Sequence, residues 1–252
     1  MPYLESDDGV AIAYESYGSG PAATLLLSHG FGSSQRAWAS NVNALSAGRL
    51  CATWDMRGHG KSDSPSAPDA YSAAHCVADM AALLDEVDAD KAVLGGLSLG
   101  GYLSLAFYLA HPERVAALML FDTGPGFRND EARQRWNDRA TAQADRLERE
   151  GLAAIGSDRW LHRSADGLAR AARGMLTQRD ASVMESLPQI TVPTLVLVGS
   201  EDKPFIGAAN YMAGKIPNAT LAVIDRAGHV SNVDRPQAFN ASVRDFLRTL
   251  GS

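Results

Sequence analysis

The sequence lacks the features that mark membrane proteins and nucleic-acid-binding proteins. Its longest purely apolar stretch, Val115 to Phe121, is far too short to cross a bilayer. No run of five or more basic residues occurs, and 23 basic against 29 acidic side chains give a net charge of −6. The first twenty residues include Glu5, Asp7 and Asp8 and no apolar segment, which argues against a secretory signal. We therefore expect neither a membrane nor a nucleic acid as a partner.

Cysteine is scarce as well. The two cysteines, Cys51 and Cys76, lie 25 residues apart in an apparent strand and an apparent helix, and no CxxC pair occurs. This spacing is typical of neither a metal site nor a disulfide framework, so we interpret both as reduced packing residues and expect a cytoplasmic protein. HExxH, Walker and cysteine–histidine motifs are also missing, and we expect no metal and no cofactor.

The chain does contain enough apolar material for one large core. Of its 252 residues, 46% are apolar and 21% are charged, close to the averages for globular proteins. Short, non-alternating apolar runs occur at residues 24–28, 50–54, 91–95, 116–121, 194–198 and 220–224. Such runs are typical of strands buried on both faces of a parallel sheet. Ahead of them, residues 2–6 and 10–17 around the turn Asp8-Gly9 predict a hairpin.

Helical stretches separate these runs, at residues 38–45, 73–87, 101–110 and 236–250. Strands that alternate with helices indicate a doubly wound α/β protein. We therefore predict an eight-stranded, mostly parallel sheet with helices on both faces.

About 70 residues between the fourth and fifth apolar runs interrupt this alternation. Eleven of the 21 residues from Asp130 to Glu150 are charged, and small or apolar residues recur every three or four positions among them. This pattern predicts an amphipathic helix with one narrow apolar stripe. Further helices are predicted at residues 167–176 and 181–187, before Pro188 and Pro193 return the chain to the sheet.

We expect this interval to be an insertion into the sheet domain. Residues 1–122 and 193–252 are the predicted core, and residues 123–192 are the predicted small helical cap. The alternative is that these extra helices merely cover the sheet.

One motif in the predicted core indicates chemistry directly. Gly96-Leu97-Ser98-Leu99-Gly100 matches GxSxG between a predicted strand and a predicted helix. A serine on such a tight turn points its hydroxyl away from the sheet and lies at a helix N-terminus, which favours negative charge. The two glycines leave room for the strand and helix to approach. Ser98 is the predicted nucleophile, and the alternative is an ordinary glycine-rich turn.

A serine hydroxyl needs a base to accept its proton and a third group to orient that base. Asp202 follows the fifth apolar run and is the predicted acid, with its neighbour Glu201 as the alternative. His229 follows the sixth run after a short loop and is the predicted base. The order Ser98, Asp202, His229 is the one expected when a GxSxG serine lies on a strand-to-helix turn.

Acyl transfer also requires N–H donors that face the developing oxyanion. Leu99, directly after the predicted nucleophile, offers one backbone N–H. Phe31, in the loop His29-Gly30-Phe31-Gly32 after the first apolar run, is predicted to offer the second. The alternative is a plain glycine turn, and we interpret His29 as a buried hydrogen-bonding residue.

Two other charged groups are conspicuous. In the segment Asp55 to Ser62 we favour a structural role for Asp55 and Arg57 over contact with a substrate. Four arginines of the predicted cap could meet an acidic substrate, but a solvated helix face is the favoured reading; they are Arg128, Arg133, Arg135 and Arg139.

Five motifs in order resemble the α/β-hydrolase superfamily over about Leu4 to Leu250, namely His29-Gly30-Phe31-Gly32, Asp55-Met56-Arg57-Gly58-His59-Gly60, Gly96-Leu97-Ser98-Leu99-Gly100-Gly101, Gly199-Ser200-Glu201-Asp202 and Gly228-His229. Within it the chain is most similar to small carboxylesterases and 3-oxoadipate enol-lactonases. Trp136, Arg139 and Glu150-Gly151-Leu152 resemble the lactonase cap, which makes Trp136 and Arg139 candidate substrate-binding residues. Serine at position 98 argues against the branches that resemble haloalkane dehalogenases and epoxide hydrolases, which use aspartate there.

The resemblance implies a serine hydrolase that cleaves a small carboxylic ester or lactone through an acyl-enzyme on Ser98. Enzymes that cleave carbon–carbon bonds in diketones or ring-fission products share the same three residue types and remain an alternative. A ligand-binding protein that keeps the fold but has negligible turnover is a second alternative, because fold does not fix function.

Overall fold

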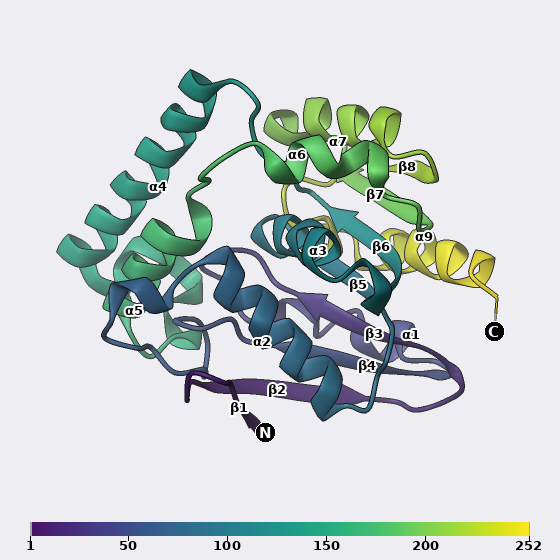
Figure 1. The fold of residues 1–252 in the computed structure, drawn as a ribbon, viewed down its shortest axis with the longest axis horizontal. Coiled ribbons are helices and arrows are strands. Elements are labelled where there is room, and N and C mark those ends of the chain that lie inside the picture. The colour runs from purple at the N-terminus through teal and green to yellow at the C-terminus, as the bar shows by residue number, and fades with distance from the viewer. Residues whose placement is uncertain (1, 252) are drawn as a thin grey trace.

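The computed structural model describes residues 2–251, and Figure 1 shows their arrangement. Within this range eight strands form one sheet in the order β1-β2-β4-β3-β5-β6-β7-β8. The strands are β1 (Tyr3–Glu5), β2 (Ala11–Tyr17), β3 (Ala22–Ser28), β4 (Arg49–Trp54), β5 (Ala92–Leu97), β6 (Val115–Phe121), β7 (Thr194–Gly199) and β8 (Ala219–Ile224). The pairs β1–β2 and β2–β4 are antiparallel and the other neighbours are parallel, which confirms the predicted sheet.

Helices connect the strands. The α-helices are α1 (Val42–Leu45), α2 (Ala73–Glu86), α3 (Leu99–Ala110), α4 (Asp130–Glu150), α5 (Ala165–Ala171), α6 (Ser182–Ser186), α7 (Lys203–Lys215), α8 (Ser231–Asp234) and α9 (Pro236–Thr249). Shorter helical segments are η1 (Gln35–Trp38), η2 (Pro68–Ala70), η3 (Pro112–Arg114), η4 (Gly151–Leu161), η5 (Ala172–Leu176) and η6 (Leu187–Gln189). No helix of the described chain combines the length and apolar character that crossing a bilayer requires.

The sheet carries a hydrophobic core on each face. In β3, Leu26 packs into the core with α2, α3 and α7, whereas Leu25 and Leu27 pack into the core with α1 and α9. This alternation follows from the two-residue period of a strand, and it explains why the apolar runs do not alternate between apolar and polar residues. Cys51 and Cys76 are free and buried, one in each core.

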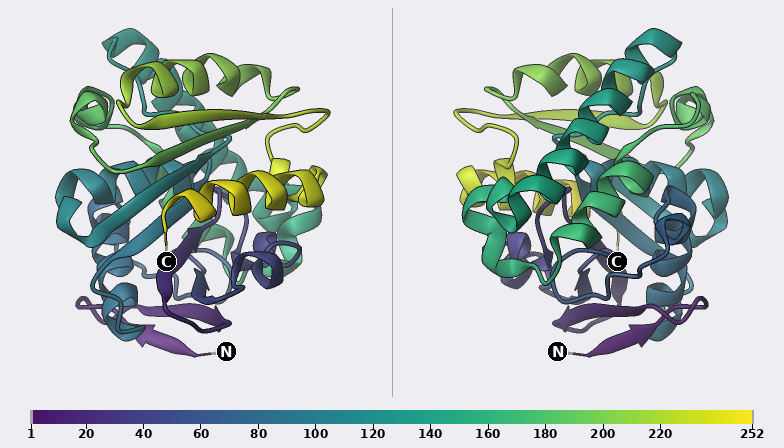
Figure 2. Two further views of the ribbon diagram at one scale, coloured as in Figure 1. Left: turned by 90° about the vertical axis from the view of Figure 1, so that its right-hand side faces the viewer. Right: turned by 90° about the vertical axis from the view of Figure 1, so that its left-hand side faces the viewer.

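The segment between β6 and β7, residues 123–192, is here called the helical insertion. The arrowheads of β3 and β6 point toward its helices α4 and α5, so the insertion lies at the carboxyl ends of these strands (Figure 1). In Figure 2, α9 crosses the front of one view and α4 the front of the opposite view. Helix α4 begins where the side chain of Asn129 accepts a hydrogen bond from Ala132 N–H, and its stripe buries Ala140, Ala144 and Leu147.

The structure differs from the predicted helices at three places. The helix predicted at residues 38–45 is divided into η1 and α1, with the poor helix formers Ser40 and Asn41 at the break. The helix predicted at residues 167–176 begins earlier as α5, because Ser164 Oγ caps it, and continues as η5. Helix α7 was not predicted, since Gly207 and Gly214 weaken its helical pattern and only Ala209 and Met212 are buried.

A buried ion pair connects the hairpin, the loop after β4 and helix α2. The Arg57 guanidinium donates two hydrogen bonds to Asp79, at 2.7 and 2.8 Å, and one at 2.8 Å to Asp8. Asp79 also accepts a hydrogen bond from Ser6 Oγ. The side chains of Arg57 and Asp79 are almost fully buried. These contacts give Arg57 a structural position within the described chain, away from the cavity described below.

We expect Asp79→Asn to lower the free energy of unfolding by about 3 kcal/mol, because it leaves the buried Arg57 charge without its main partner. Urea denaturation at pH 7 measures the change. Asp85→Asn is the matched control, since Asp85 lies on the same helix in an exposed pair with Arg114, and it should cost about 0.5 kcal/mol or less. Equal losses of unfolding free energy in the two variants would contradict a special role for the buried pair of Arg57 and Asp79.

Candidate active site

Ser98 lies at the junction of β5 and α3 in a strained backbone conformation. Its φ of 53° and ψ of −113° are rare for a residue with a side chain. The junction is tight, since a Cβ on Gly96 would lie 2.1 Å from Gly100 O. Ser98 N–H donates to Phe121 O at 2.9 Å, and Thr123 Oγ1 donates to Ser98 O at 2.6 Å. Neighbouring elements therefore fix the strained turn in place.

The structure brings the three predicted catalytic side chains together. His229 Nε2 lies 3.0 Å from Ser98 Oγ, and His229 Nδ1 lies 2.8 Å from Asp202 Oδ2. Asp202 is 4% exposed, whereas its alternative Glu201 is exposed to solvent. The Phe205 ring stacks on the His229 imidazole with 4.7 Å between centroids. This arrangement has the geometry that a nucleophile, a base and an orienting acid require.

Asp122, directly after β6, forms hydrogen bonds with the segments next to Asp202 and His229. Its carboxylate accepts hydrogen bonds from Gly199 N–H at 2.8 Å, from Ser231 N–H at 3.2 Å and from Ser231 Oγ at 2.5 Å. Burial raises the pKa of Asp122 to about 6, against the effect of these hydrogen bonds. Asp122 was not among the residues predicted from the sequence, although its place after a buried strand is the signal that identified Asp202.

The loop after β3 forms a turn next to Ser98. Ser33 N–H donates to Gly30 O at 3.2 Å, His29 Nδ1 lies 2.7 Å from the same oxygen, and Gly32 has a φ of +71°. A Cβ on Gly30 would lie 3.4 Å from Ser98 Cβ, so the turn passes close to the serine. The backbone N–H groups of Phe31 and Leu99 have no acceptor within residues 2–251. Both groups are free to donate to a ligand near Ser98.

Three histidines below this turn are neutral in the folded chain. His29 Nε2 accepts from Met56 N–H, and His162 Nδ1 accepts from Gly60 N–H, so neither of these ring nitrogens carries a proton. Burial lowers the pKa of His29 to about 4, and it also lowers the pKa values of His59 and His162. Their rings adjoin one another, with 5.2 Å between His29 and His59 and 5.9 Å between His59 and His162. They are packing and hydrogen-bonding groups.

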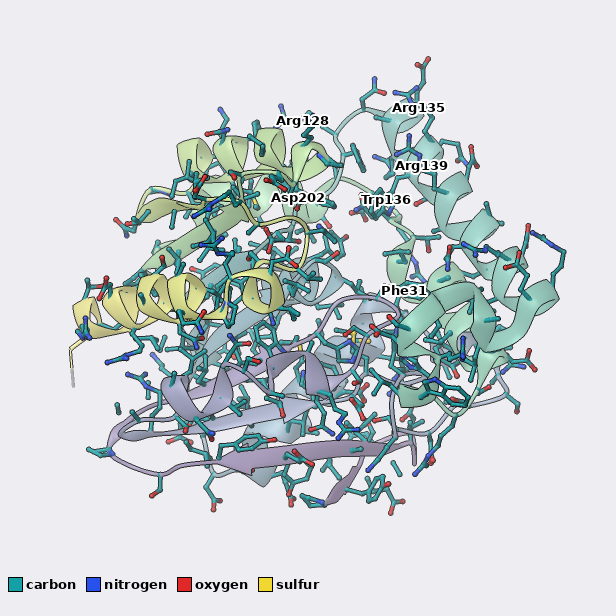
Figure 3. All side chains as sticks on the ribbon, turned by 180° about the vertical axis from the view of Figure 1, so that it is seen from behind. Phe31, Arg128, Arg135, Trp136, Arg139 and Asp202 are labelled. Carbon is teal, nitrogen blue, oxygen red and sulfur yellow. The ribbon has the colours of Figure 1, made fainter. Side chains whose placement is uncertain are left out.

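A cavity of about 360 Å³ opens beside Ser98, between the helical insertion and α7. Its lining is mainly apolar and comprises Ser98, Leu99, Tyr102, Thr123, Gly124, Gly126, Phe127, Trp136, Arg139, Leu176, Gln178, Pro204, Phe205 and Ala208. Both candidate substrate-binding residues, Trp136 and Arg139, therefore reach the cavity from α4. Figure 3 shows these two side chains with Phe31 and Asp202. Within the described chain, no cluster of three or more His, Cys, Asp or Glu side chains could hold a metal ion.

The four arginines considered above differ in their surroundings. Arg133 pairs with Asp130 and Arg135 pairs with Glu131, and neither of these arginines nor Arg128 lines the cavity. Arg139 lines it and has no acidic partner within residues 2–251. Arg139 is therefore the one of the four that can meet a molecule in the cavity.

Comparison with known proteins places these features in context. Residues 25–242 match the family described as alpha/beta hydrolase family. A putative 2-succinyl-6-hydroxy-2,4-cyclohexadiene-1-carboxylate synthase from Bacillus subtilis is 30% identical over 267 residues, which cover 96% of this chain and 97% of the relative. The 3-oxoadipate enol-lactonase 2 of Acinetobacter baylyi is 26% identical, covering 95% and 94% of the two chains.

Among solved structures, a thermophilic esterase from Thermogutta terrifontis superposes with a TM-score of 0.82. It is 29% identical, and the alignment covers 100% of this chain and 99% of the esterase. The similar proteins thus carry three different activity names on one fold, so the fold alone does not specify the reaction.

We expect the free energy of unfolding to fall as the pH drops from about 6.5 to about 4. In this window the unfolded chain binds protons on His29, His59 and His162 that the folded chain excludes, and His29 alone accounts for about 3 kcal/mol at pH 4. Asp122 acts in the opposite direction, because its raised pKa lets the folded chain bind a proton first, but it is one group against three. Urea denaturation between pH 7 and pH 4 measures the slope.

His162→Gln should make this slope shallower, since it removes one of the three titrating groups. His111→Gln is the control, because His111 lies partly exposed on the far end of α3. A free energy of unfolding that stays constant from pH 7 to pH 4 would refute the assignment of neutral buried histidines.

Proposed function

The chain belongs to the alpha/beta hydrolase family, and from this premise we propose that it hydrolyses a small carboxylic ester or lactone through an acyl-enzyme on Ser98. The observation that carries the proposal is the continuous hydrogen-bond chain from Ser98 through His229 to Asp202, which begins at a cavity of about 360 Å³. A hydroxyl with a base in hydrogen-bond reach, beside space for a small molecule, is the arrangement that acyl transfer requires.

Acylation begins when Ser98 Oγ attacks the substrate carbonyl carbon. His229 Nε2 takes the hydroxyl proton as the Oγ–C bond forms, and Asp202 holds the imidazole through Nδ1 and stabilises its positive charge. His229 then returns the proton to the leaving oxygen as the C–O bond breaks. An ester releases an alcohol at this step, whereas a lactone keeps the new hydroxyl on its acyl chain.

Deacylation repeats these steps with water as the nucleophile. His229 accepts a proton from the water as it attacks the acyl carbon, and then returns that proton to Ser98 Oγ as the acid leaves. In both steps the N–H groups of Phe31 and Leu99 donate to the carbonyl oxygen as it becomes an oxyanion. One such donor contributes about 3 kcal/mol to the stability of the transition state.

The helical insertion, residues 123–192, serves in this proposal as the cap over the substrate. Trp136 forms part of the apolar wall, and its indole N–H is fixed by a 2.8 Å hydrogen bond to Leu176 O. Arg139 supplies a positive charge at a mainly apolar cavity and interacts with a negatively charged or polar part of the substrate.

We expect Ser98→Ala to lower kcat for p-nitrophenyl butyrate by about 10⁴-fold or more, because it removes the hydroxyl that lies in hydrogen-bond reach of His229 Nε2. Initial rates and the mass of a phosphonate adduct on Ser98 measure the role of this residue. Ser104→Ala is the matched control, since Ser104 lies on α3, the helix directly after Ser98, and its buried hydroxyl donates to Gly100 O, and it should keep activity within a few-fold.

Three other outcomes would redirect the assignment. Comparable rates in wild type and Ser98→Ala would refute the nucleophile. Turnover of a vinylogous 1,5-diketone without turnover of esters or lactones would identify a carbon–carbon hydrolase. Stoichiometric labelling of Ser98 without repeated turnover of any ester, lactone or diketone would identify a ligand-binding protein.

Arg139→Gln should raise KM about tenfold for an anionic ester such as mono-p-nitrophenyl succinate and leave KM for p-nitrophenyl butyrate unchanged. The expected change is about 1.4 kcal/mol, in the range of one charge-assisted contact. Arg135→Gln is the control, because Arg135 lies one turn earlier on α4 and pairs with Glu131. An equal change in both KM values would show that Arg139 does not recognise charge.

A further inference from the structure

The turn that carries Phe31 contacts two parts of the molecule, the neighbourhood of Ser98 and the helical insertion. Its Gly30 end adjoins Ser98, where a Cβ on Gly30 would lie 3.4 Å from Ser98 Cβ. The Phe31 side chain packs both against the core that contains α2, α3 and α7 and against a hydrophobic cluster of the helical insertion. This cluster, called the insertion cluster, consists of Ala144, Leu147, Ala154, Leu168, Ala169 and Ala172.

A second contact joins the insertion to the next residue of the turn. A Cβ on Gly32 would lie 3.5 Å from Ile155 Cγ2, so η4 of the insertion packs directly on Gly32. Ile155 itself packs against the insertion cluster. The turn is therefore in contact with the insertion at two successive residues, Phe31 and Gly32.

His162, at the end of η4, makes the polar contact. Its Nε2 lies 3.1 Å from Gly32 O, and its Nδ1 lies 3.0 Å from Gly60 N. Because a backbone N–H can only donate, Nδ1 is unprotonated and Nε2–H donates to Gly32 O. His162 is 7% exposed, so water does not readily replace these bonds. One tautomer of one side chain thus connects the insertion, the turn and the loop after β4.

The ring of His59 completes the packing around this contact. It lies edge-on to Phe31 with 5.3 Å between centroids, and it adjoins the ring of His162. Phe31 and His162 are therefore held against the same buried ring. His162 thus contacts the turn directly at Gly32 O and borders the Phe31 side chain through the His59 ring.

We infer that His162 is a positioning residue, which holds the Gly30–Ser33 turn so that Phe31 N–H donates to the developing oxyanion. This inference rests on the proposed function, in which Phe31 supplies that donor. Gly32 has a positive φ, and its peptide units can rotate at little steric cost unless something holds its carbonyl. The peptide between Gly32 and Ser33 is held on both sides: Ser33 N–H donates to Gly30 O within the turn, and the Nε2–H of His162 holds the carbonyl from the insertion. The insertion thereby contributes to the reaction rate as well as to the wall of the cavity.

The test compares His162→Ala with His162→Gln in p-nitrophenyl butyrate hydrolysis. His162→Ala should lower kcat by about tenfold to 100-fold and change KM less than threefold, because the lost donor acts in the transition state. His162→Gln should keep kcat within about threefold, since its amide oxygen can accept from Gly60 N–H while its amide nitrogen donates to Gly32 O.

Affinity for a butyl trifluoromethyl ketone gives a readout that a purely structural role would not change. Its adduct with Ser98 places an oxyanion where Phe31 N–H donates, so the inhibition constant should rise with the loss of kcat in His162→Ala. Ser164→Ala is the matched control, because Ser164 caps α5 through Gly167 N–H and does not touch the turn. It should lower the melting temperature without changing kcat or the inhibition constant.

Two results would overturn the inference. One is a His162→Ala variant that melts earlier, as Ser164→Ala does, and keeps the wild-type kcat and inhibition constant. The other is a His162→Gln variant that loses as much kcat as His162→Ala. Failure of the proposed function is distinct, since Ser98→Ala would then remain active, whereas failure of this inference alone leaves Ser98 essential.

Discussion

The strained backbone of Ser98 is the constraint on which the rest of the site depends. A residue with φ of 53° and ψ of −113° costs on the order of 1–3 kcal/mol and persists only where its surroundings fix it. Here β5, α3 and the end of β3 meet so closely that Gly96 and Gly100 have no room for a side chain, and Ser98 N–H donates to Phe121 O at the end of β6. The same crowding projects the hydroxyl beyond the carboxyl ends of the strands, toward the loops that follow β6, β7 and β8.

The parallel order of β6, β7 and β8 determines which groups those loops can bring to Ser98. Each strand ends at the same edge of the sheet, so Asp122, Asp202 and His229 meet there although 107 residues separate the first from the last. Asp122 accepts hydrogen bonds from both of the other loops and is fully buried. Burying a carboxylate costs desolvation free energy, and the three hydrogen-bond donors compensate for that cost. As a result the two loops are fixed relative to each other.

The sequence was sufficient for the parts of this arrangement that local patterns specify. The six apolar runs and the hairpin pattern predicted the eight strands, and the positions of Ser98, Asp202 and His229 after three of these runs predicted that their side chains meet, as they do at 2.8 and 3.0 Å. Helix α7 was not predicted, because its glycines and few buried positions weaken the helical period of apolar residues on which such predictions rely. The contact of His162 with Gly32 spans 130 residues, and no local pattern encodes a hydrogen bond over that separation.

The placement of Phe31 limits how freely the two parts of this chain can be recombined. Its side chain packs against the insertion cluster, whereas its backbone belongs to the loop after β3. An insertion taken from a relative would need hydrophobic side chains that pack against Phe31 in the same way. Without them, a cavity would form next to Phe31. A chimera that takes its insertion from a homologue therefore also needs a residue 31 that packs against the transferred insertion.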